Sequence, residues 1–75
     1  MENRIRSERE ARSWTQVVLA AHLEVSRQTV VALETGKYDP SLPLAFRIAK
    51  VFDKPIEGIF FPEGRSLVVK DAAID

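Results

Sequence analysis

Two short helix-forming stretches, separated by only a tight turn, constrain the fold of this chain most. The first, TQVVLAAHL, opens with Thr15, a residue type that favours the N-cap of a helix. The second opens with another N-cap residue, Ser26, and stops before Gly36, the residue type that most often follows a helix end. Only Glu24 and Val25 lie between the two, so they must form the turn. Such short helices are marginal alone, so the rest of the chain is expected to pack around the pair.

The charged segment 3–13 is expected to form the first helix, with Asn3 as its N-cap. It contains only two apolar residues, one of which is Ile5, so its stability must come from packing against other helices. Glu8 lies one turn after Ile5, on the expected inner face. It also precedes Arg12 by four residues, a spacing typical of a favourable surface ion pair. If Glu8 points inward it needs a partner, because an unpaired buried carboxylate is costly.

A fourth helix is expected from the N-cap Ser41 through Phe52, because apolar residues recur there at helical spacing. A short fifth helix is expected over Pro55–Phe60. Ser66–Lys70 is the one stretch with a strand-forming composition. Since no second strand is expected, this strand must either fray or pair with its copy in another molecule. Asp71–Asp75 is expected to be a loose tail.

The composition bounds the class of protein. Seventy-five residues make one small domain, and the net charge of zero argues mildly against a general binder of polyanions. The chain has no cysteine, which excludes a disulfide framework and a thiolate metal site and suits a reducing compartment. The charged N-terminal segment is not a signal peptide, and no apolar run approaches the roughly 18 residues of a membrane span. We therefore expect a cytoplasmic location and no membrane partner.

A catalytic function is poorly supported by the residues. His22 is the only histidine and is expected on the surface of a short helix. The sequence has no glycine-rich phosphate loop, no defensible nucleophile and base, and no cluster of metal ligands. We therefore expect no enzyme, no cofactor and no metal ion.

Two short helices joined by a tight turn are the arrangement with which helix–turn–helix proteins dock on DNA. The second helix enters the major groove through its N-terminal residues, where Arg27 and Gln28 stand. Arginine can bond the guanine edge and glutamine the adenine edge, while Thr29 could contact a thymine methyl or a phosphate. Gln16 starts the preceding helix, where a backbone N–H and a side-chain amide can hold a phosphate. The alternative is that Arg27 and Gln28 are ordinary surface residues of a first helical turn.

The string TQVVLAAHLEVSRQTVVALETGKYDPSLPLAFRIAKVF resembles the phage-repressor-like (Cro/CI, or XRE-type) helix–turn–helix family, most closely its short bacterial regulators. The match covers about residues 3–62, and VSRQT followed by ETGKYDPSL is highly specific. The resemblance implies an all-α, compact five-helix, lambda-repressor-like DNA-binding domain over residues 1–62. Its motif helices would span about 15–23 and 26–35. Residues 63–75 would be a C-terminal extension with a dimerisation strand and a loose tail.

The resemblance also implies roles for residues at matching positions. Base contacts fall on Arg27, Gln28, Ala32 and Thr29, and phosphate contacts on Gln16, Thr35, Lys37 and Tyr38. A partly buried ion pair is expected between Arg9 on the first helix and Glu34 late in the third. The alternative for that pair is two unrelated, solvated charges.

The function that the resemblance implies is sequence-specific transcription regulation, as a repressor that binds a palindromic double-stranded operator as a homodimer. From the strand argument, the dimer contact is expected at Phe60, Phe61, Leu67, Val68 and Val69. The alternative is a protein-binding module, such as an antitoxin that also represses its own operon.

The chain departs from its family at several positions. Glu24 stands where members often have glycine, and Glu8 stands where they often have leucine. Val17 and Val18 replace residues that are usually polar or acidic, and Val31 is unusually apolar for the outer face of a reading helix. The two adjacent valines are either extra core or an exposed patch for a protein partner.

Overall fold

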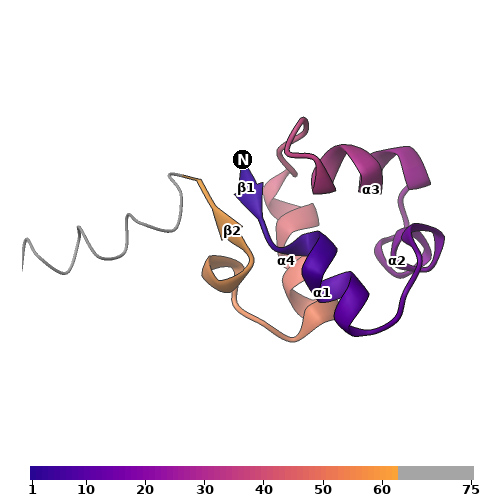
Figure 1. Cartoon of the computed structure of the whole chain (residues 1–75). Coiled ribbons are helices and arrows are strands. Elements are labelled where there is room, and N and C mark those ends of the chain that lie inside the picture. Colours follow the sequence, from indigo (N-terminus) through magenta and orange to yellow (C-terminus); the bar gives the residue numbers. More distant parts are fainter. Residues whose placement is uncertain (63–75) are drawn as a thin grey trace, which may run out of the picture.

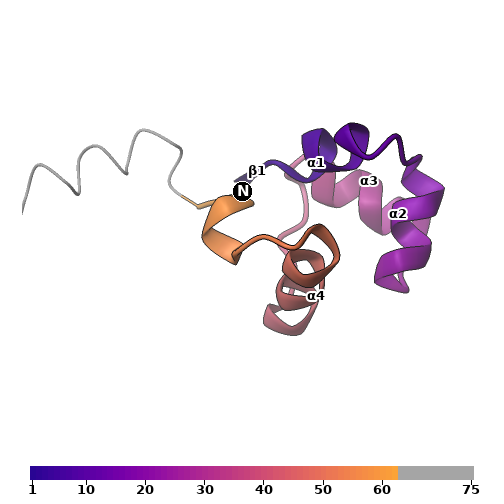
Figure 2. The ribbon, with the colours of Figure 1, turned by 90° about the horizontal axis from the view of Figure 1, so that it is seen from below.

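A computed structural model describes residues 1–62 of the chain. In these residues it shows four α-helices, one 3-10 turn and two very short strands (Figure 1). The α-helices are α1 (Ile5–Ala11), α2 (Gln16–Leu23), α3 (Arg27–Glu34) and α4 (Leu42–Phe52). The other elements are β1 (Glu2–Asn3), the turn η1 (Ile56–Gly58) and β2 (Phe60–Phe61). Figures 1 and 2 show α2 and α3 together at one end of this part of the chain and the strands toward the other.

Hydroxyl side chains start three of the helices. Thr15, Ser26 and Ser41 precede α2, α3 and α4 respectively. The hydroxyl oxygen of each accepts a hydrogen bond from the backbone N–H three residues later, at 3.1 to 3.3 Å. Each bond satisfies one of the N–H groups that a helix start leaves without an internal partner. The predicted N-caps at Thr15, Ser26 and Ser41 are therefore confirmed.

Left-handed backbone conformations end three of the helices. Ser13, Glu24 and Asp53 have φ angles of 58°, 59° and 54°, and they are the non-glycine residues with positive φ within residues 1–62. Gly36, with φ 77°, confirms its expected place just after α3. A side chain in this conformation costs about 1–2 kcal/mol because its Cβ crowds the following carbonyl oxygen. The turn at Glu24, where the family resemblance led us to expect glycine, is therefore strained.

The hydrophobic core lies between α2, α3 and α4 and is closed by α1 and the segment around η1. The largest fully buried side chains of the described residues are Ile5, Leu19, Leu23, Val30, Leu33, Ile48, Phe52 and Ile59. Burying a side chain of this size contributes about 1.5–3 kcal/mol. Ile5 is the residue through which the otherwise charged α1 reaches this core.

The N-terminal segment forms a strand instead of the first turn of a helix. Asn3 was predicted as an N-cap, but α1 begins only at Ile5 and is capped by Arg4 without a side-chain hydrogen bond. The Asn3 side chain instead donates from Nδ2 to Leu33 O at 2.8 Å and accepts from Ile5 N at 3.0 Å. These bonds tie the chain start to the end of α3, which explains why the predicted helix over residues 3–13 is too long.

The C-terminal end of the described chain is extended, where a fifth helix was predicted over Pro55–Phe60. Only η1 is helical there, because Phe60 and Phe61 form β2 and pair antiparallel with β1, with Glu2 opposite Phe61. Phe60 is only 6% exposed, so its side chain belongs to the monomer core. Contact of Phe60 with a second copy stays a prediction, although little of its side chain is left exposed for one. The strand predicted at Ser66–Lys70 lies outside the described residues.

Glu8 is buried, although its pair with Arg12 was predicted to lie on the surface. Its carboxylate accepts hydrogen bonds from Arg12 Nη1 at 2.9 Å and lies 3.0 Å from Lys54 Nζ, which comes from the segment after α4. Burial by itself raises the pKa of Glu8, but the bonds from Lys54 and Arg12 outweigh it and hold the pKa below the ordinary 4.5. Arg12 also donates to Phe52 O at 2.8 Å, so the cluster fastens α1 to the end of α4.

A second buried ion pair fastens α1 to α3. Arg9 Nε lies 2.6 Å from Glu34 Oε2, and Arg9 Nη2 lies 3.2 Å from Glu34 Oε1. The two side chains are 11% and 4% exposed, so these charges are not merely solvated neighbours. Arg9 Nη1 also donates to Trp14 O at 2.8 Å, which fixes the guanidinium on its other side. The hydrogen bond that Arg9 donates to Glu34 is the main reason that the pKa of Arg9 is raised.

Replacing Glu34 with alanine should lower the free energy of unfolding by about 3–5 kcal/mol, because it leaves the Arg9 guanidinium buried without its partner. Urea denaturation at neutral pH measures the change. Arg6→Ala is the matched control: Arg6 is an exposed residue of α1 that pairs with Glu10, and losing such a surface pair should cost under about 1 kcal/mol. Equal losses in the two variants would contradict a buried pair.

Replacing Glu24 with glycine should raise the melting temperature. The substitution relieves a left-handed cost of about 1 kcal/mol, which corresponds to roughly 4–8 °C in a domain of this size. Differential scanning calorimetry tests this, with the exposed helical Ala21→Gly as a control that should destabilise by about 1 kcal/mol. A melting temperature that stays constant or falls in Glu24→Gly would show that the turn carries no such strain.

Replacing Glu8 with glutamine should destabilise the protein by about 1–3 kcal/mol at pH 7, because two charge-assisted hydrogen bonds are weakened. Since the folded pKa lies below 4.5, this stabilisation is complete above that pH and is lost as the pH falls through the folded pKa. The difference in the free energy of unfolding between the wild type and Glu8→Gln should therefore become smaller as the pH is lowered. Denaturation curves at pH 7, 5 and 3 measure it, with Glu57→Gln as an exposed control; a constant gap argues against the lowered pKa.

Candidate nucleic-acid interface

The turn between α2 and α3 fixes how the two helices meet. Glu24 reverses the chain, and Val25 N donates to Ala20 O at 3.0 Å. Arg47 reaches from α4 and donates to Leu23 O, at the end of α2, at 2.9 Å. Figure 1 shows α3 from the side and α2 nearly end-on, so α3 lies across α2 instead of alongside it. One side of α3 packs on the core, and the other side is left to solvent.

The first turn of α3 presents the residues that were expected to read bases. Arg27 and Gln28 are exposed, and within residues 1–62 neither side chain forms a hydrogen bond or ion pair. Thr29 is half-buried, and its hydroxyl lies 3.0 Å from that of Ser26. Ala32 is half-buried one turn after Gln28, on the same side of the helix. Two long polar side chains are thus free to reach outward, beside a small residue that allows a close approach.

The residues just after α3 differ in what they can offer a phosphate. Lys37 and Tyr38 are exposed, and Tyr38 is 43% accessible. The Thr35 hydroxyl instead donates back to Val31 O at 3.0 Å and to Ala32 O at 3.2 Å. Its proton is therefore used inside the helix end, and a phosphate contact from Thr35 would require the side chain to rotate.

Gln16 occupies the first position of α2 and is half-buried. Its amide Nε2 donates to Glu34 Oε1 at 3.3 Å, so the residue expected to anchor a phosphate contacts the carboxylate that also holds Arg9. This contact was not predicted from the sequence. Gln16 and Glu34 are separated by 18 positions on different helices, and no local pattern signals their approach.

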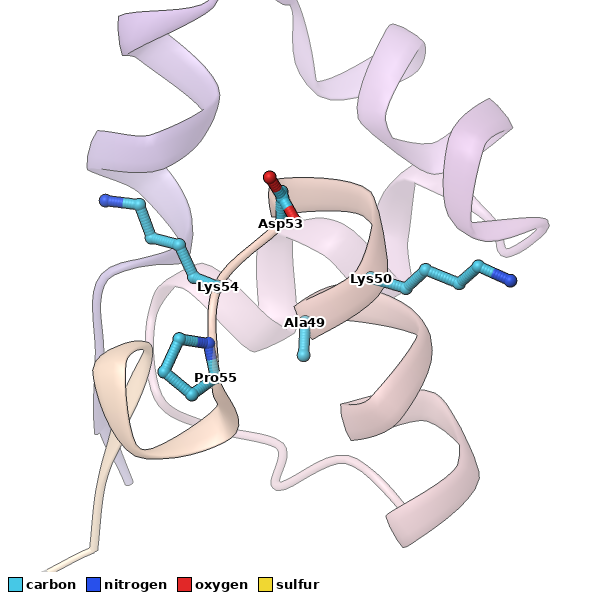
Figure 3. Close-up of a pocket in the computed structure, with 5 residues that line it drawn as sticks. All are labelled: Ala49, Lys50, Asp53, Lys54 and Pro55. Carbon is cyan, nitrogen blue, oxygen red and sulfur yellow. The ribbon is translucent and has the colours of Figure 1, made fainter.

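The described residues contain no obvious site for a small ligand or a metal. A shallow pocket of about 360 Å³ lies at the end of α4, but Lys50 and Lys54 point in different directions around it (Figure 3). Lys54 is also used by Glu8. Residues 1–62 hold no group of three or more histidine, cysteine, aspartate or glutamate side chains placed to bind a metal ion. Among the helices of this same part of the chain, none is long and apolar enough to cross a membrane.

His22 was expected on the surface of α2. It is exposed there, and its ring stacks on the Trp14 ring with centroids 4.3 Å apart.

Several apolar side chains face solvent away from the core. Val17 is 60% exposed and Val18 is 38% exposed, which favours the surface-patch interpretation of these valines over extra core. Val31 is half-buried. On α4, Leu42 is 65% and Phe46 57% exposed. Phe46 also lines an open groove of about 530 Å³ between α4 and the end of α2.

Comparison with known proteins places this geometry in a family. A family model described as helix-turn-helix matches residues 5–59, which is most of the chain. The chain is 54% identical over 63 residues to an uncharacterized HTH-type transcriptional regulator of Methanocaldococcus jannaschii, covering 84% of this chain and 96% of that protein. It is 46% identical over 67 residues to another from Archaeoglobus fulgidus, covering 89% and 96% respectively.

A third relative shows that the similarity crosses domains of life. An uncharacterized HTH-type transcriptional regulator of Bacillus subtilis is 40% identical over 63 residues, covering 84% of this chain and 96% of the relative. Because archaeal and bacterial proteins both match, the resemblance does not specify the bacterial origin that was expected. The motif match and these relatives agree with the two crossed helices described above. The chain therefore belongs to the XRE-type helix–turn–helix family of transcriptional regulators.

Proposed function

We propose that this protein is a sequence-specific, double-stranded DNA-binding transcriptional repressor that inserts α3 into the major groove. The observation that carries the proposal is the first turn of α3. Arg27 and Gln28 are exposed there without partners in residues 1–62, on a helix held firmly across α2. Helix–turn–helix proteins contact base edges from this turn of the second helix.

The side chains of this turn suit base recognition. Arg27 can bond guanine O6 and N7 together, and Gln28 can bond adenine N6 and N7, each worth about 1–3 kcal/mol of discrimination. Ala32 follows Gln28 by one turn and can contact a thymine methyl group. Thr29 shares its hydroxyl with Ser26 and so offers its methyl group most readily.

The phosphate contacts would come from both ends of the motif. Gln16 stands at the start of α2, where the first backbone N–H groups lack helical partners and attract anions. Lys37 and Tyr38 follow α3, and Lys37 adds a positive charge there. Such contacts set the register of the protein on DNA but carry no sequence information. Thr35 joins them only if its hydroxyl leaves the carbonyls of α3.

A homodimer is the second part of the proposal. One domain of this size offers few phosphate contacts, whereas two related by a two-fold axis read half-sites about 34 Å apart. We assign the domain to residues 1–62 and the dimer contact to Phe60, Phe61 and Leu67–Val69, with Phe61 offering more exposed surface than Phe60. A bound dimer represses by covering its operator, which requires no further chemistry from the protein.

A protein-binding module that also represses its own operon, such as an antitoxin, is the second candidate. The exposure of the adjacent residues Val17 and Val18 favours it, because exposed apolar residues that lie together often mark a protein contact. A stoichiometric complex with the product of an adjacent reading frame, lost in Val17→Lys but retained in Arg27→Ala, would support this role. A neighbouring gene product that never binds the chain argues against it.

Alanine at Arg27 or Gln28 should each remove about 1–3 kcal/mol of discrimination at one base pair of an operator selected from random DNA. Binding to operators with every single base substitution, measured by fluorescence anisotropy, gives the position of each loss. Arg6→Ala is the matched control, since Arg6 is an exposed arginine of α1 paired with Glu10. If both α3 variants bind and discriminate like the wild type, α3 does not read the groove.

Deleting residues 66–75 should convert the dimer into a monomer, because it removes the strand proposed to pair between copies. Light scattering at micromolar concentration measures the mass, and circular dichroism confirms that the helices remain folded. The deletion should also weaken operator binding, since each monomer then reads one half-site alone. If the truncated protein forms a dimer as stable as that of the full-length protein, this strand does not hold the dimer together.

A further inference from the structure

The carboxylate of Glu34 connects all three helices that surround the predicted DNA-binding surface. Glu34 is the last residue of α3 and its side chain is 4% exposed. It accepts from Arg9 of α1 through two nitrogens and from the Gln16 amide of α2 at 3.3 Å. Arg9 is itself held by Trp14 O, so Glu34 cannot swing away without breaking several bonds.

This arrangement determines which way the Gln16 amide faces. A primary amide carries two N–H donors and one carbonyl acceptor, and its two orientations differ only by a half-turn. A carboxylate accepts hydrogen bonds and repels the amide oxygen, so Glu34 selects the orientation with Nε2 toward it. One N–H of Nε2 then bonds Glu34, and the other is left to donate beside the first backbone N–H groups of α2.

We propose that Glu34 is a positioning residue for DNA binding: it holds the Gln16 amide as a hydrogen-bond donor toward a backbone phosphate. This inference rests on the proposed function, in which Gln16 contacts that phosphate. Glu34 itself does not touch DNA, because it is buried and negatively charged. Without it, the amide can turn its oxygen toward the phosphate, and the contact becomes repulsive.

Glu34 could instead affect DNA binding only by stabilising the fold through its ion pair with Arg9. In that case Glu34 would affect DNA binding independently of Gln16. A double-mutant cycle on operator affinity separates the two roles, because only residues that act through one another give non-additive effects. The cycle compares the full-length wild type, Gln16→Ala, Glu34→Gln and the double variant, all well below their melting temperatures.

We expect Gln16→Ala and Glu34→Gln each to weaken binding to the selected operator by about 3- to 10-fold, the effect of one net hydrogen bond. The double variant should bind no more weakly than Gln16→Ala. An Arg9→Lys variant keeps the positive charge beside Glu34. In this variant, Gln16→Ala should still weaken operator binding as it does in the wild type. Should Glu34→Gln fail to fold, Glu34→Asp keeps the charge opposite Arg9 but draws it back from Gln16, and takes its place in the cycle.

Independent effects that multiply in the double variant would overturn the inference, as would full affinity in either single variant. These results differ from a failure of the proposed function. If Arg27→Ala still loses discrimination at one base pair while the cycle is additive, α3 reads DNA but Glu34 does not position Gln16. If no operator is selected at all, the proposed function itself fails.

Discussion

The buried carboxylate of Glu34 is the interaction on which the arrangement of the first three helices depends. A chain of 75 residues has a small core, and α1 contributes to it chiefly through Ile5. The bonds from Arg9 and Gln16 to Glu34 add a polar connection between α1, α2 and α3. Buried ion pairs are costly to break although they add little net stability, so this one favours a single relative placement of the helices.

The same principle appears at the neighbouring residue of α1, where Glu8 joins Arg12 and Lys54. A leucine, the residue that the family resemblance led us to expect here, would bury apolar surface without needing a partner. Here the carboxylate is buried, and the loss of apolar packing is offset by two cations that bring the end of α4 against α1. Two buried acids thus hold a helix that the hydrophobic core alone would hold weakly.

The two strands add a further connection to the C-terminal end of α3. β1 pairs with β2, and Asn3 reaches past the pairing to bond Leu33 O at the end of α3. The C-terminal end of α3 is therefore fixed by Glu34 and Asn3 together, while its first turn remains open to solvent. Because it is anchored at one end and exposed at the other, α3 could enter a groove, as we propose, without the rest of the domain rearranging.

Local patterns in the sequence predicted the helix starts at Thr15, Ser26 and Ser41, because an N-cap is a bond between neighbours along the chain. The helical ends at residues 3 and 60 were predicted wrongly, because the strand pairing that overrides helix formation there joins opposite ends of the domain.

The candidate site shows the same division between local and long-range information. The position of Arg27 and Gln28 followed from the cap at Ser26, and their exposure agrees with that expectation. The contact of Glu8 with Lys54 and that of Gln16 with Glu34 depend on how distant segments meet, which no single stretch of sequence encodes. The exposure of Val17 likewise depends on which face of α2 the other helices cover.

The motif itself offers few cations to DNA, since Arg27 and Lys37 are the arginine and lysine residues between positions 15 and 37. Affinity should therefore come from correct base contacts and from dimer formation more than from general attraction to phosphates. The ratio of operator binding to binding of unrelated DNA is therefore a more informative property to measure than the affinity for one DNA alone.

Selection of bound duplexes from a random DNA pool by the full-length chain tests the central claim most directly. The account predicts enrichment of an inverted repeat whose half-site centres lie about 10–10.5 base pairs apart, or a multiple of this, with guanine and adenine at the positions nearest Arg27 and Gln28. A bound pool with the same base composition and no repeat, indistinguishable from the input, would contradict it.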